Sequence, residues 1–278
     1  MNAKQLPANL TLVLGASGKT GRRIVQRLAA DGVPTRPGSR TGIPPFDWNH
    51  PAGWDACLTG VHALYISYTP DLAMPGARDA IQHLVSRAED HGLQRLVLLS
   101  GRGEEEAQRC EDVVLASRVP ATVIRASWFN QNFSEGAFAE MVKAGRITLP
   151  AGDVPEPFVD ADDIADVARA ALTQDGHTGE VYEVTGPRSL GFSEVAAELA
   201  QATGQPIDYQ PVTHDAFVSG IKRSGAPKEV VWMLDYLFAT VLDGRNAKPT
   251  SGVSRALGRP PKDFTAYARQ AAASGVWS

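Results

Sequence analysis

Cysteine is scarce in this chain of 278 residues, which contains only Cys57 and Cys110. Two cysteines cannot form a disulfide framework or a cysteine-rich metal site, so we expect both to be small, buried apolar side chains. The histidines show no metal-ligand spacing such as H-x-x-x-H, and no G-x-S-x-G motif is present. The sequence therefore predicts no metal site and no hydrolase-type serine nucleophile.

Long apolar runs and dense basic segments are also absent. No segment approaches the roughly 20 apolar residues of a membrane span, and the start of the chain, MNAKQLPANL, lacks the apolar core of a signal peptide. The net charge is −4, and Lys and Arg are dispersed, which argues against a large nucleic-acid surface. We expect a cytoplasmic protein that binds neither nucleic acid nor membrane.

A glycine motif stands near the start of the chain, in the segment LTLVLGASGKTG. The apolar run Leu10–Leu14 predicts a strand, and Gly15, Gly18 and Gly21 follow at three-residue spacing before an amphipathic helix. Such glycines allow a tight turn, close approach of the backbone to a pyrophosphate, and close packing of helix on strand. The helix N-terminus offers N–H groups to the phosphates. The pattern indicates a dinucleotide-binding turn, with an ordinary strand–helix turn as the alternative.

Polar residues around this turn are predicted to bind the same cofactor. Ser17, Lys19 and Thr20 lie between or beside the glycines and add hydrogen-bond donors. Ser67 ends the predicted strand 63–67, at the carboxyl end where open α/β sheets bind ligands.

The residues at the end of the predicted second strand indicate which dinucleotide is bound. Proteins selective for NAD place Asp or Glu there to hold the ribose 2′-hydroxyl, whereas this chain has Arg36, Ser39 and Arg40. A guanidinium pairs with a 2′-phosphate that a carboxylate would repel. The sequence therefore predicts NADP(H), and two surface arginines in a loop are the alternative.

The segment Phe46-Asp47-Trp48 is predicted as a short third strand. Asp47 is placed to accept a hydrogen bond from the adenine amino group, and Trp48 to shield the ring. A plain core role for Trp48 is equally compatible with the sequence.

Strands alternate with helices through the first two thirds of the chain. Further strands are predicted at 63–67, 96–99, 121–125 and 181–184. This alternation predicts an α/β, Rossmann-type, doubly wound and mostly parallel sheet. After Gly186 the pattern becomes mainly helical, with Ser193 as the expected N-cap of the next helix. We expect a core at 1–126, to which 151–186 returns, and a smaller lobe at 127–150 and 187–278.

The predicted helix 229–242 is apolar on nearly all sides, since it contains Val, Met, Leu and Phe at most positions. Such a helix is expected to be buried against the sheet domain or a second subunit. The sequence therefore leaves open whether the chain forms a homodimer or binds another protein.

Five segments together resemble the NmrA-like family of atypical short-chain dehydrogenases/reductases. They are LVLGASGKTGRRIVQRL (12–28), PATVIRASWFNQNF (120–133), FVDADDIADVA (158–168), YEVTGP (182–187) and LGRPPKDFTAYAR (257–269). The resemblance implies an NADP(H)-type Rossmann domain with a small C-terminal substrate lobe. It also implies that Trp128 and Asn132, with Tyr68, line a substrate pocket beside the nicotinamide, and that Asp163 caps a helix.

The chain departs from that family at the predicted helix 104–117, EEEAQRCEDVVLAS. Short-chain dehydrogenases carry there a Tyr that protonates the substrate and a Lys that lowers its pKa, and this segment contains neither. Some relatives that reduce ethers place a lone Lys near the start of this helix, where Gly103 or Glu104 stands. Glu111 resembles a glutamate common in the family, or is a solvated helix charge.

The catalytic group is therefore unknown from the sequence. Tyr68 and Ser100 are weak candidates for the proton donor, together with Tyr65, because all three lie near the carboxyl ends of predicted strands. Two hypotheses follow. One is an NADPH-dependent reductase of a small molecule, aromatic or quinone-like. The other is a non-catalytic, redox-sensing regulator that binds NADP(H) and acts through a protein partner.

Overall fold

The computed structural model describes residues 9–278. The strands are β1 (Leu10–Leu14), β2 (Thr35–Gly38), β3 (Val61–Ile66), β4 (Arg95–Gly101), β5 (Ala121–Ala126), β6 (Arg146–Leu149), β7 (Val181–Val184) and β8 (Asp208–Pro211). The α-helices are α1 (Lys19–Ala30), α2 (Trp54–Leu58), α3 (Ala77–Asp90), α4 (Glu105–Leu115), α5 (Ala137–Lys143), α6 (Ala161–Thr173), α7 (Phe192–Thr203), α8 (His214–Arg223), α9 (Lys228–Tyr236), α10 (Gly252–Leu257) and α11 (Phe264–Ala273). Short 3-10 helices occupy Pro51–Gly53 and Asn130–Phe133, and a π-helical turn, Leu237–Val241, continues α9.

Six strands form one sheet in the order β2-β1-β3-β4-β5-β7, which confirms the predicted doubly wound fold. The pairs β1–β2, β1–β3 and β3–β4 are parallel. From β1 the chain passes outward to β2 and then returns to β3 on the other side of β1. The strand order thus reverses between β1 and β3, and open sheets bind ligands at the carboxyl ends of such strands.

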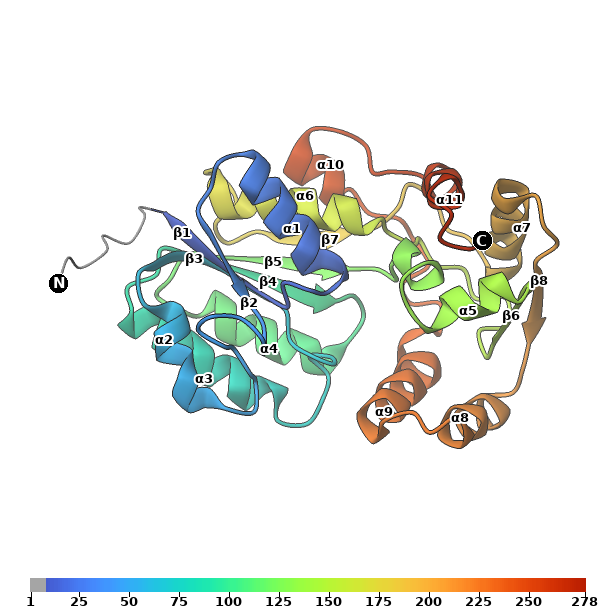
Figure 1. Ribbon diagram of the computed structural model, residues 1–278, viewed down its shortest axis with the longest axis horizontal. Helices are drawn as coiled ribbons and strands as arrows, with labels where there is room; N and C mark the ends of the chain where they lie inside the picture. Colours follow the sequence, from blue (N-terminus) through green and yellow to red (C-terminus); the bar gives the residue numbers. More distant parts are fainter. Residues whose placement is uncertain (1–8) are drawn as a thin grey trace. The chain divides into compact units, whose positions relative to one another are not determined.

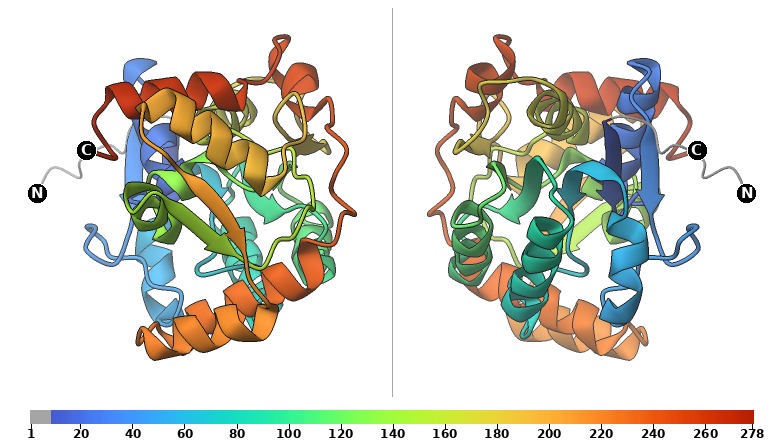
Figure 2. Two further views of the ribbon diagram at one scale, coloured as in Figure 1. Left: turned by 90° about the vertical axis from the view of Figure 1, so that its right-hand side faces the viewer. Right: turned by 90° about the vertical axis from the view of Figure 1, so that its left-hand side faces the viewer.

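Helices cover both faces of this sheet (Figure 1). Helices α1 and α6 lie on one face, and α2, α3 and α4 lie on the other; Figure 2 shows the same layers from two further directions. Helix α1 buries Ile24 and Leu28. The guanidinium of Arg27 contacts the Asp166 carboxylate at 2.5 Å and therefore ties α1 to α6.

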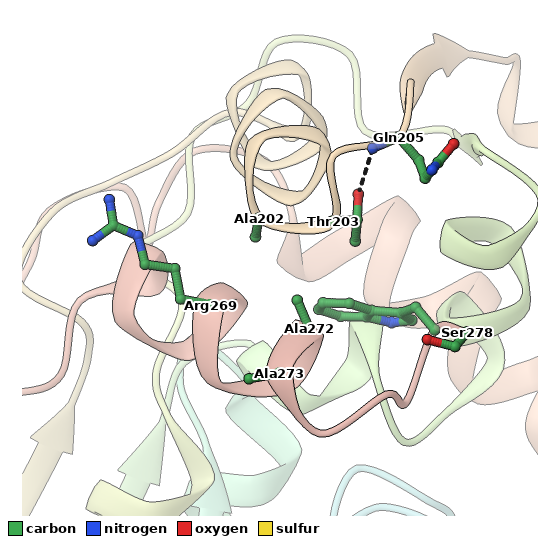
Figure 3. Close-up of a pocket in the computed structure, with 8 residues that line it drawn as sticks. Ala202, Thr203, Gln205, Arg269, Ala272, Ala273 and Ser278 are labelled. Atoms are coloured by element: carbon green, nitrogen blue, oxygen red, sulfur yellow. Dashed lines mark hydrogen bonds between the residues drawn. The ribbon is translucent and has the colours of Figure 1, made fainter.

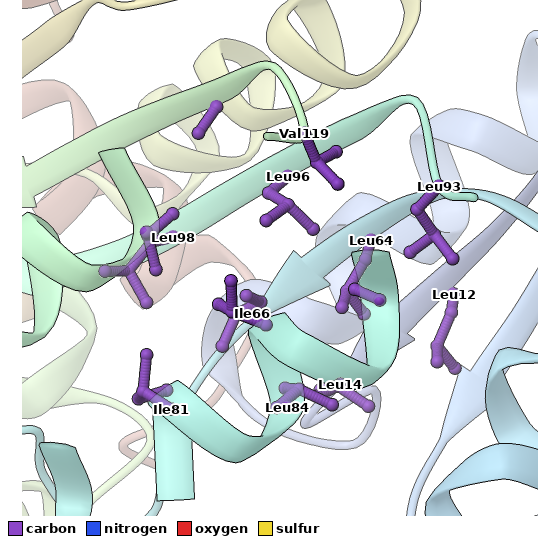
Figure 4. Close-up of a cluster of buried hydrophobic side chains, with 14 of the residues drawn as sticks. Leu12, Leu14, Leu64, Ile66, Ile81, Leu84, Leu93, Leu96, Leu98 and Val119 are labelled. Carbon is purple, nitrogen blue, oxygen red and sulfur yellow. The ribbon is translucent and has the colours of Figure 1, made fainter. Parts of the chain in front are cut away.

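An aliphatic core fills the space between the sheet and helices α3 and α4 (Figure 4). Strand residues Leu12, Leu64 and Ile66 are fully buried, as is Ile81 of α3. Because both faces of the strands are covered, the strand sequences are near-continuous apolar runs. Each such side chain contributes about 1.5–3 kcal/mol by burial.

The chain divides into two compact units, each with its own core. Unit 1 comprises the described residues up to Arg125, with 164–182 and 255–257, and unit 2 comprises 126–163, 183–254 and 258–278. The core of unit 2 is rich in phenylalanine, and Phe133 at its centre contacts the rings of Phe138, Phe158 and Phe264. None of the helices in the described part of the chain is long and apolar enough to cross a membrane.

Three sequence expectations are wrong in detail. Phe46–Trp48 is not a strand, because Asp47 and Asn49 form a turn there instead. The N-cap of α7 is Gly191, not Ser193, since Glu194 reaches back to the Gly191 N–H at 2.8 Å and starts the helix earlier. The helix predicted over 229–242 is α-helical only as far as Tyr236 and continues as the π-helical turn; Trp232 is exposed by 36% in the single chain, so burial of this helix against a second subunit stays a prediction.

Candidate functional site

The glycine turn after β1 has the geometry that its sequence predicts. Gly15 has a positive φ of +66°. Its backbone packs closely against Ser67, since a Cβ atom added to Gly15 would lie only 3.3 Å from the Cβ atom of Ser67. A Cβ on Gly21 would lie 2.1 Å from the Gly15 carbonyl oxygen, so only glycine permits helix α1 to start this close to the turn. Gly15 and Gly21 therefore make the tight turn possible, and Ser67 packs against one side of it.

Gly18 is the N-cap of α1, and it differs from the other two glycines in being exposed. It provides no side-chain cap for the helix, and the first turn of α1 contains no acidic residue. The first N–H groups of a helix have no partner within the helix and carry the positive end of its dipole. An anion would therefore be stabilised at this helix start.

One polar side chain of the turn, that of Thr20, has a structural partner on β3. Thr20 is buried, and its hydroxyl accepts a hydrogen bond of 2.9 Å from the Tyr65 hydroxyl. Burial raises the pKa of Tyr65 above its ordinary range. Because Tyr65 is fully buried and its proton is engaged by Thr20, this geometry argues against Tyr65 as a proton donor. Ser17, in contrast, is exposed beside Gly18.

Strand β2 ends at Gly38, so Ser39 and Arg40 follow directly after it. Arg40 is exposed, and Ser39 is partly buried. Arg36 lies within the strand, and its Nη1 donates to the carbonyl oxygens of Cys57 and Thr59 at the end of α2. Arg40 is therefore better placed than Arg36 to meet a 2′-phosphate, and the assignment of all three residues to the cofactor stays a prediction.

An aromatic cluster lies beside the carboxyl ends of β2 and β3. The Trp48 ring packs 4.7 Å from the Tyr68 ring and 5.1 Å from the Phe46 ring, centroid to centroid. Trp48 and Tyr68 are only partly buried, which leaves part of each ring accessible. Burial raises the pKa of Tyr68.

Asp47 is already engaged within this loop. Its carboxylate accepts hydrogen bonds from the Asn49 N–H at 2.9 Å and from His50 at 3.1 Å, and the Asn49 N–H is the main cause of its lowered pKa. The predicted contact with an adenine would need one of the remaining lone pairs of this carboxylate.

At the carboxyl end of β4, Ser100 belongs to a buried polar network. Its hydroxyl donates to Oε1 of Glu111 at 2.6 Å, and Arg125 forms an ion pair with Glu111 at 2.6 Å. Glu111 is exposed by only 1%, so the interpretation of this residue as a solvated charge on the helix surface is wrong. Since the Ser100 proton points into the network, the geometry argues against Ser100 as a donor to a substrate.

A second buried carboxyl lies at the same end of β4, and the sequence analysis attached no chemistry to it. Glu104 is exposed by 4%, and among the described residues nothing donates a hydrogen bond to its Oε2. Burial, and then the nearby Asp71 carboxyl, raise the pKa of Glu104 well above its ordinary range. The sequence signal for this buried carboxyl is the segment S-G-R-G-E (100–104), because a glycine three residues before the glutamate that starts a helix leaves room for the glutamate side chain.

The residues predicted to contact substrate after β5 all lie in unit 2. The Trp128 ring packs 5.1 Å from Phe238 and is partly buried, as is Asn132. Sequence reasoning missed Asn130, which is fully buried with both side-chain amide atoms lacking partners among the described residues. That Trp128, Asn132 and Tyr68 share one pocket stays a prediction.

The cap of α6 is Asp160 rather than Asp163, which corrects the role that the resemblance implied. Asp160 accepts a hydrogen bond of 2.7 Å from the Asp162 N–H. Asp163 is fully buried and instead holds the C-terminal segment, since its carboxylate accepts the Lys262 N–H and pairs with Arg259, both at 2.7 Å. Both carboxylates thus have structural roles.

A surface pocket of about 510 Å³ lies in unit 2 between the end of α7 and α11 (Figure 3). It is lined by Ala202, Thr203, Gln205, Arg269, Ala272, Ala273, Trp277 and Ser278. None of the residues predicted to bind cofactor or substrate lies in this lining. Over residues 9–278, no group of three or more His, Cys, Asp or Glu side chains could hold a metal ion.

The sheet order and the glycine turn define the class of fold: the chain has a Rossmann-type α/β fold, which it shares with the NAD(P)-binding proteins on which it superposes. No family model matches the sequence. An NAD(P)H azoreductase from Xenophilus azovorans is 27% identical over 290 residues, which cover 95% of this chain and 99% of the relative.

Solved structures agree on the fold. An NADPH-dependent quinone oxidoreductase from Escherichia coli, complexed with NADPH, superposes with a TM-score of 0.75 at 20% identity and covers 94% of this chain and 99% of its own. NmrA, a negative transcriptional regulator in complex with NADP, superposes with a TM-score of 0.71 at 17% identity, with 95% of each chain covered. The resemblance to NmrA-like proteins is thus confirmed at the level of the fold.

Proposed function

We propose that this protein is an NADPH-dependent reductase of a small, quinone-like or other aromatic molecule. The observation that carries the proposal is the glycine turn between β1 and α1, located where the strand order reverses. Gly18 leaves the start of α1 without a side chain, so a pyrophosphate can reach the helix N–H groups. The similarity to an NAD(P)H azoreductase and to an NADPH-complexed quinone oxidoreductase supports the same cofactor and reaction type.

The residues after β2 fit the phosphorylated form of the cofactor. Between Asp31 and Asp47 the sequence contains no acidic residue, and Arg40 is exposed directly after the strand. Its guanidinium would pair with a 2′-phosphate, with Ser39 as an additional donor. Trp48, partly exposed beside this loop, would cover one side of the adenine.

The chemistry follows from what the chain supplies and what it lacks. Reduced nicotinamide, when bound, supplies a hydride. Helix α4 carries no Tyr and no Lys, so a carbonyl that needs strong protonation by this pair is a poor substrate. Quinones and azo compounds accept a hydride into a conjugated system that delocalises the resulting charge. The partly exposed ring of Tyr68 offers a flat apolar surface to such an acceptor.

The test is NADPH oxidation, followed at the near-ultraviolet band of the reduced nicotinamide, against quinones, azo dyes, enones and aldehydes. We expect turnover with the first two classes and none with simple aldehydes. Gly18→Val should abolish it, whereas the matched control Gly220→Val, on α8 with no heavy atom near its Cβ position, should retain it. Turnover confined to aldehydes would contradict the proposed substrate class.

A second candidate is a non-catalytic regulator that senses the redox state of NADP(H). The missing Tyr and Lys on α4 favour it, as does the similarity to NmrA. A regulator should bind NADP(H) calorimetrically yet oxidise NADPH with no member of the acceptor panel. Its affinity for a protein partner should then differ between the oxidised and reduced cofactor.

A further inference from the structure

The side chain of Glu104 occupies a space that the sequence keeps open for it. A Cβ atom on Gly101 would lie 1.7 Å from Oε1 of Glu104, so the carboxyl fits against the end of β4 only because residue 101 is glycine. Glu104 is the N-cap of α4, yet its side chain does not cap the helix. The carboxyl is therefore directed away from the helix N–H groups that would stabilise its charged form.

The neighbour of this carboxyl is a second carboxyl, that of Asp71, in the loop after β3. The Asp71 carboxyl lies close enough to Glu104 to raise its pKa, both through its charge and by hydrogen bonding. Carboxylates only accept hydrogen bonds, so this contact requires that one of the two groups carries a proton. The pair thus shares a proton, as paired carboxyls do when like charges approach closely.

The surroundings place that proton on Glu104. Oδ1 of Asp71 accepts a hydrogen bond of 2.7 Å from the Ala73 N–H, so this oxygen already has a donor. Asp71 is also partly exposed to solvent. Glu104 is exposed by 4% and nothing in residues 9–278 donates to its Oε2, so ionisation there would be unfavourable.

Other charged groups around the pair leave this assignment unchanged. Glu111 of α4 is a further negative neighbour and disfavours ionisation of Glu104. Its own charge is compensated by Arg125 of β5 at 2.6 Å. Burial raises the pKa of the Cys110 thiol on α4. Of the nearby charges, that of Arg78 on α3 lowers this pKa and that of Asp71 raises it.

We propose that the Glu104–Asp71 pair is the proton relay of the reduction, in place of the Tyr and Lys that α4 lacks. The inference rests on the proposed function. Both carboxyls belong to unit 1, and they follow β4 and β3, whose carboxyl ends lie at the same edge of the sheet as the glycine turn. Asp71 is the partly exposed member of the pair, and Glu104 is the buried member that holds the proton.

The step balances in atoms and electrons. A quinone or azo acceptor receives a hydride, with both its electrons, from reduced nicotinamide, and the π-electron pair moves to the oxygen or nitrogen at the far end of the conjugated system. The Glu104 O–H bond breaks as its proton passes to an Asp71 carboxylate oxygen, and Asp71 delivers that same proton to this atom, which gains a new O–H or N–H bond. Glu104 is left ionised, and it regains a proton from water through Asp71.

The test uses the full chain with NADPH and the best quinone of the panel. Glu104→Gln keeps the size of the side chain and can donate to Asp71, but it holds no transferable proton. Glu106→Gln, at an exposed position on the same helix that pairs with Arg109 at 3.1 Å, is the matched control. We expect kcat to fall about 10²- to 10⁴-fold for Glu104→Gln, with NADPH affinity unchanged, and both parameters to stay within twofold for the control.

Two readouts separate proton transfer from a structural role. The kcat of the wild-type protein should decline as pH rises through the raised pKa of Glu104. This decline and the solvent deuterium effect on kcat should vanish in Glu104→Gln. Independently of activity, the infrared carbonyl band of a protonated carboxyl at pH 7 should be present in the wild type and missing in Glu104→Gln. Asp71→Asn should also lower kcat.

The failures are distinguishable. If wild-type protein oxidises NADPH with no acceptor, the proposed function fails and the relay fails with it. If the wild type turns over a quinone and Glu104→Gln matches Glu106→Gln in kcat and pH profile, only the relay is overturned. A wild-type spectrum without the infrared band of Glu104 would overturn the shared proton itself.

Discussion

The helices α1 and α4 both start at the carboxyl end of a strand of the same sheet, yet their first turns are built in opposite ways. Helix α1 starts at Gly18, which is exposed, has no side chain and is followed by no acidic residue in the first turn. Helix α4 starts at the buried Glu104 and carries Glu105 and Glu106 in its first turn. The N-termini of α1 and α4 both carry the positive end of a helix dipole, so the side chains decide whether an anion can bind at each helix start.

This difference separates a site for an anion from a site for a proton. At α1 an incoming phosphate would meet N–H groups and no negative charge. At α4 the negative charges of the protein itself occupy the favourable position, and a phosphate would be repelled. The buried Glu104 at this helix start is instead suited to holding a proton, which the proposed reduction also requires.

The largest expected effect comes from breaking the internal charge pairing at α4. Glu111→Ala should lower the free energy of unfolding by about 3–5 kcal/mol, because it leaves the Arg125 guanidinium without its buried partner. Urea unfolding followed by circular dichroism measures the loss. A double variant, Glu111→Met with Arg125→Met, should recover most of the stability. A single variant as stable as the wild type would show that the pair is not needed.

The next effect tests the open start of α1. Gly18→Val should weaken NADPH binding at least about a hundredfold, because its branched side chain projects where the pyrophosphate would lie. The fold should survive, since the backbone of Gly18 is extended (φ −76°, ψ 177°) and the Gly15 carbonyl oxygen, 3.2 Å from a Cβ there, has to shift only slightly. Calorimetric titration and thermal melting measure the two quantities. Gly21→Ala, with a backbone contact of 2.1 Å, should lower both.

A smaller effect distinguishes the two cofactors. Arg40→Ala should weaken NADPH binding about ten- to a hundredfold and leave NADH binding unchanged, because it removes one charge-assisted contact of roughly 1.5–3 kcal/mol. Arg36→Ala is the informative companion, since Arg36 already donates to backbone carbonyls. Equal losses for NADPH and NADH in Arg40→Ala would contradict the assignment to the 2′-phosphate.

The pH dependence of stability tests the buried proton at α4. The native state keeps the Glu104 proton at pH values where the unfolded chain releases it, above the ordinary value of 4.5. Stability therefore falls as pH rises from about 5 to 8, by at most about 1.4 kcal/mol per pH unit for one proton. Glu104→Gln should remove this contribution, as measured by urea unfolding across that range. An identical pH slope in both proteins would contradict the raised pKa.

The smallest effect is expected at the exposed side of α4. Glu106→Gln removes a surface ion pair with Arg109, both side chains being at least half exposed. Exposed pairs within a helix contribute about 0.3–0.5 kcal/mol. The melting temperature should therefore change by no more than about 2 °C. A larger change would indicate that the whole first turn of α4, not only its buried residues, is important for stability.

The sheet was predictable from the sequence because its strands are covered on both faces and read as apolar runs, as in Leu10–Leu14. The glycine turn was predictable for a similar reason: positive φ at Gly15 and close packing at Gly21 leave few alternatives to glycine. The two strands of the separate small sheet, β6 and β8, were missed. In β8, for example, Asp208–Pro211 is polar and largely exposed, so no period-two pattern identifies it.

The polar side chains were harder to assign because their partners are far away in sequence. Asp163 precedes the interior of α6 and has the sequence of a cap, but its partners are Arg259 and Lys262, nearly a hundred residues later. The same holds for Glu104, whose protonation depends on Asp71 in another loop. Local sequence predicts turns and caps, whereas the burial of a carboxyl is set by tertiary packing.

The distribution of aromatic residues described above has an optical consequence. Trp48 and Trp54 belong to unit 1, and Trp128, Trp232 and Trp277 belong to unit 2. Trp48 and Trp54 pack edge to face with ring centroids 5.6 Å apart, close to the loop proposed to receive the adenine. Replacing the tryptophans of one unit by phenylalanine would leave emission from the other unit alone. Each half of the molecule therefore contains its own intrinsic fluorophores, and ligand binding and unfolding can be followed separately in each half without an added dye.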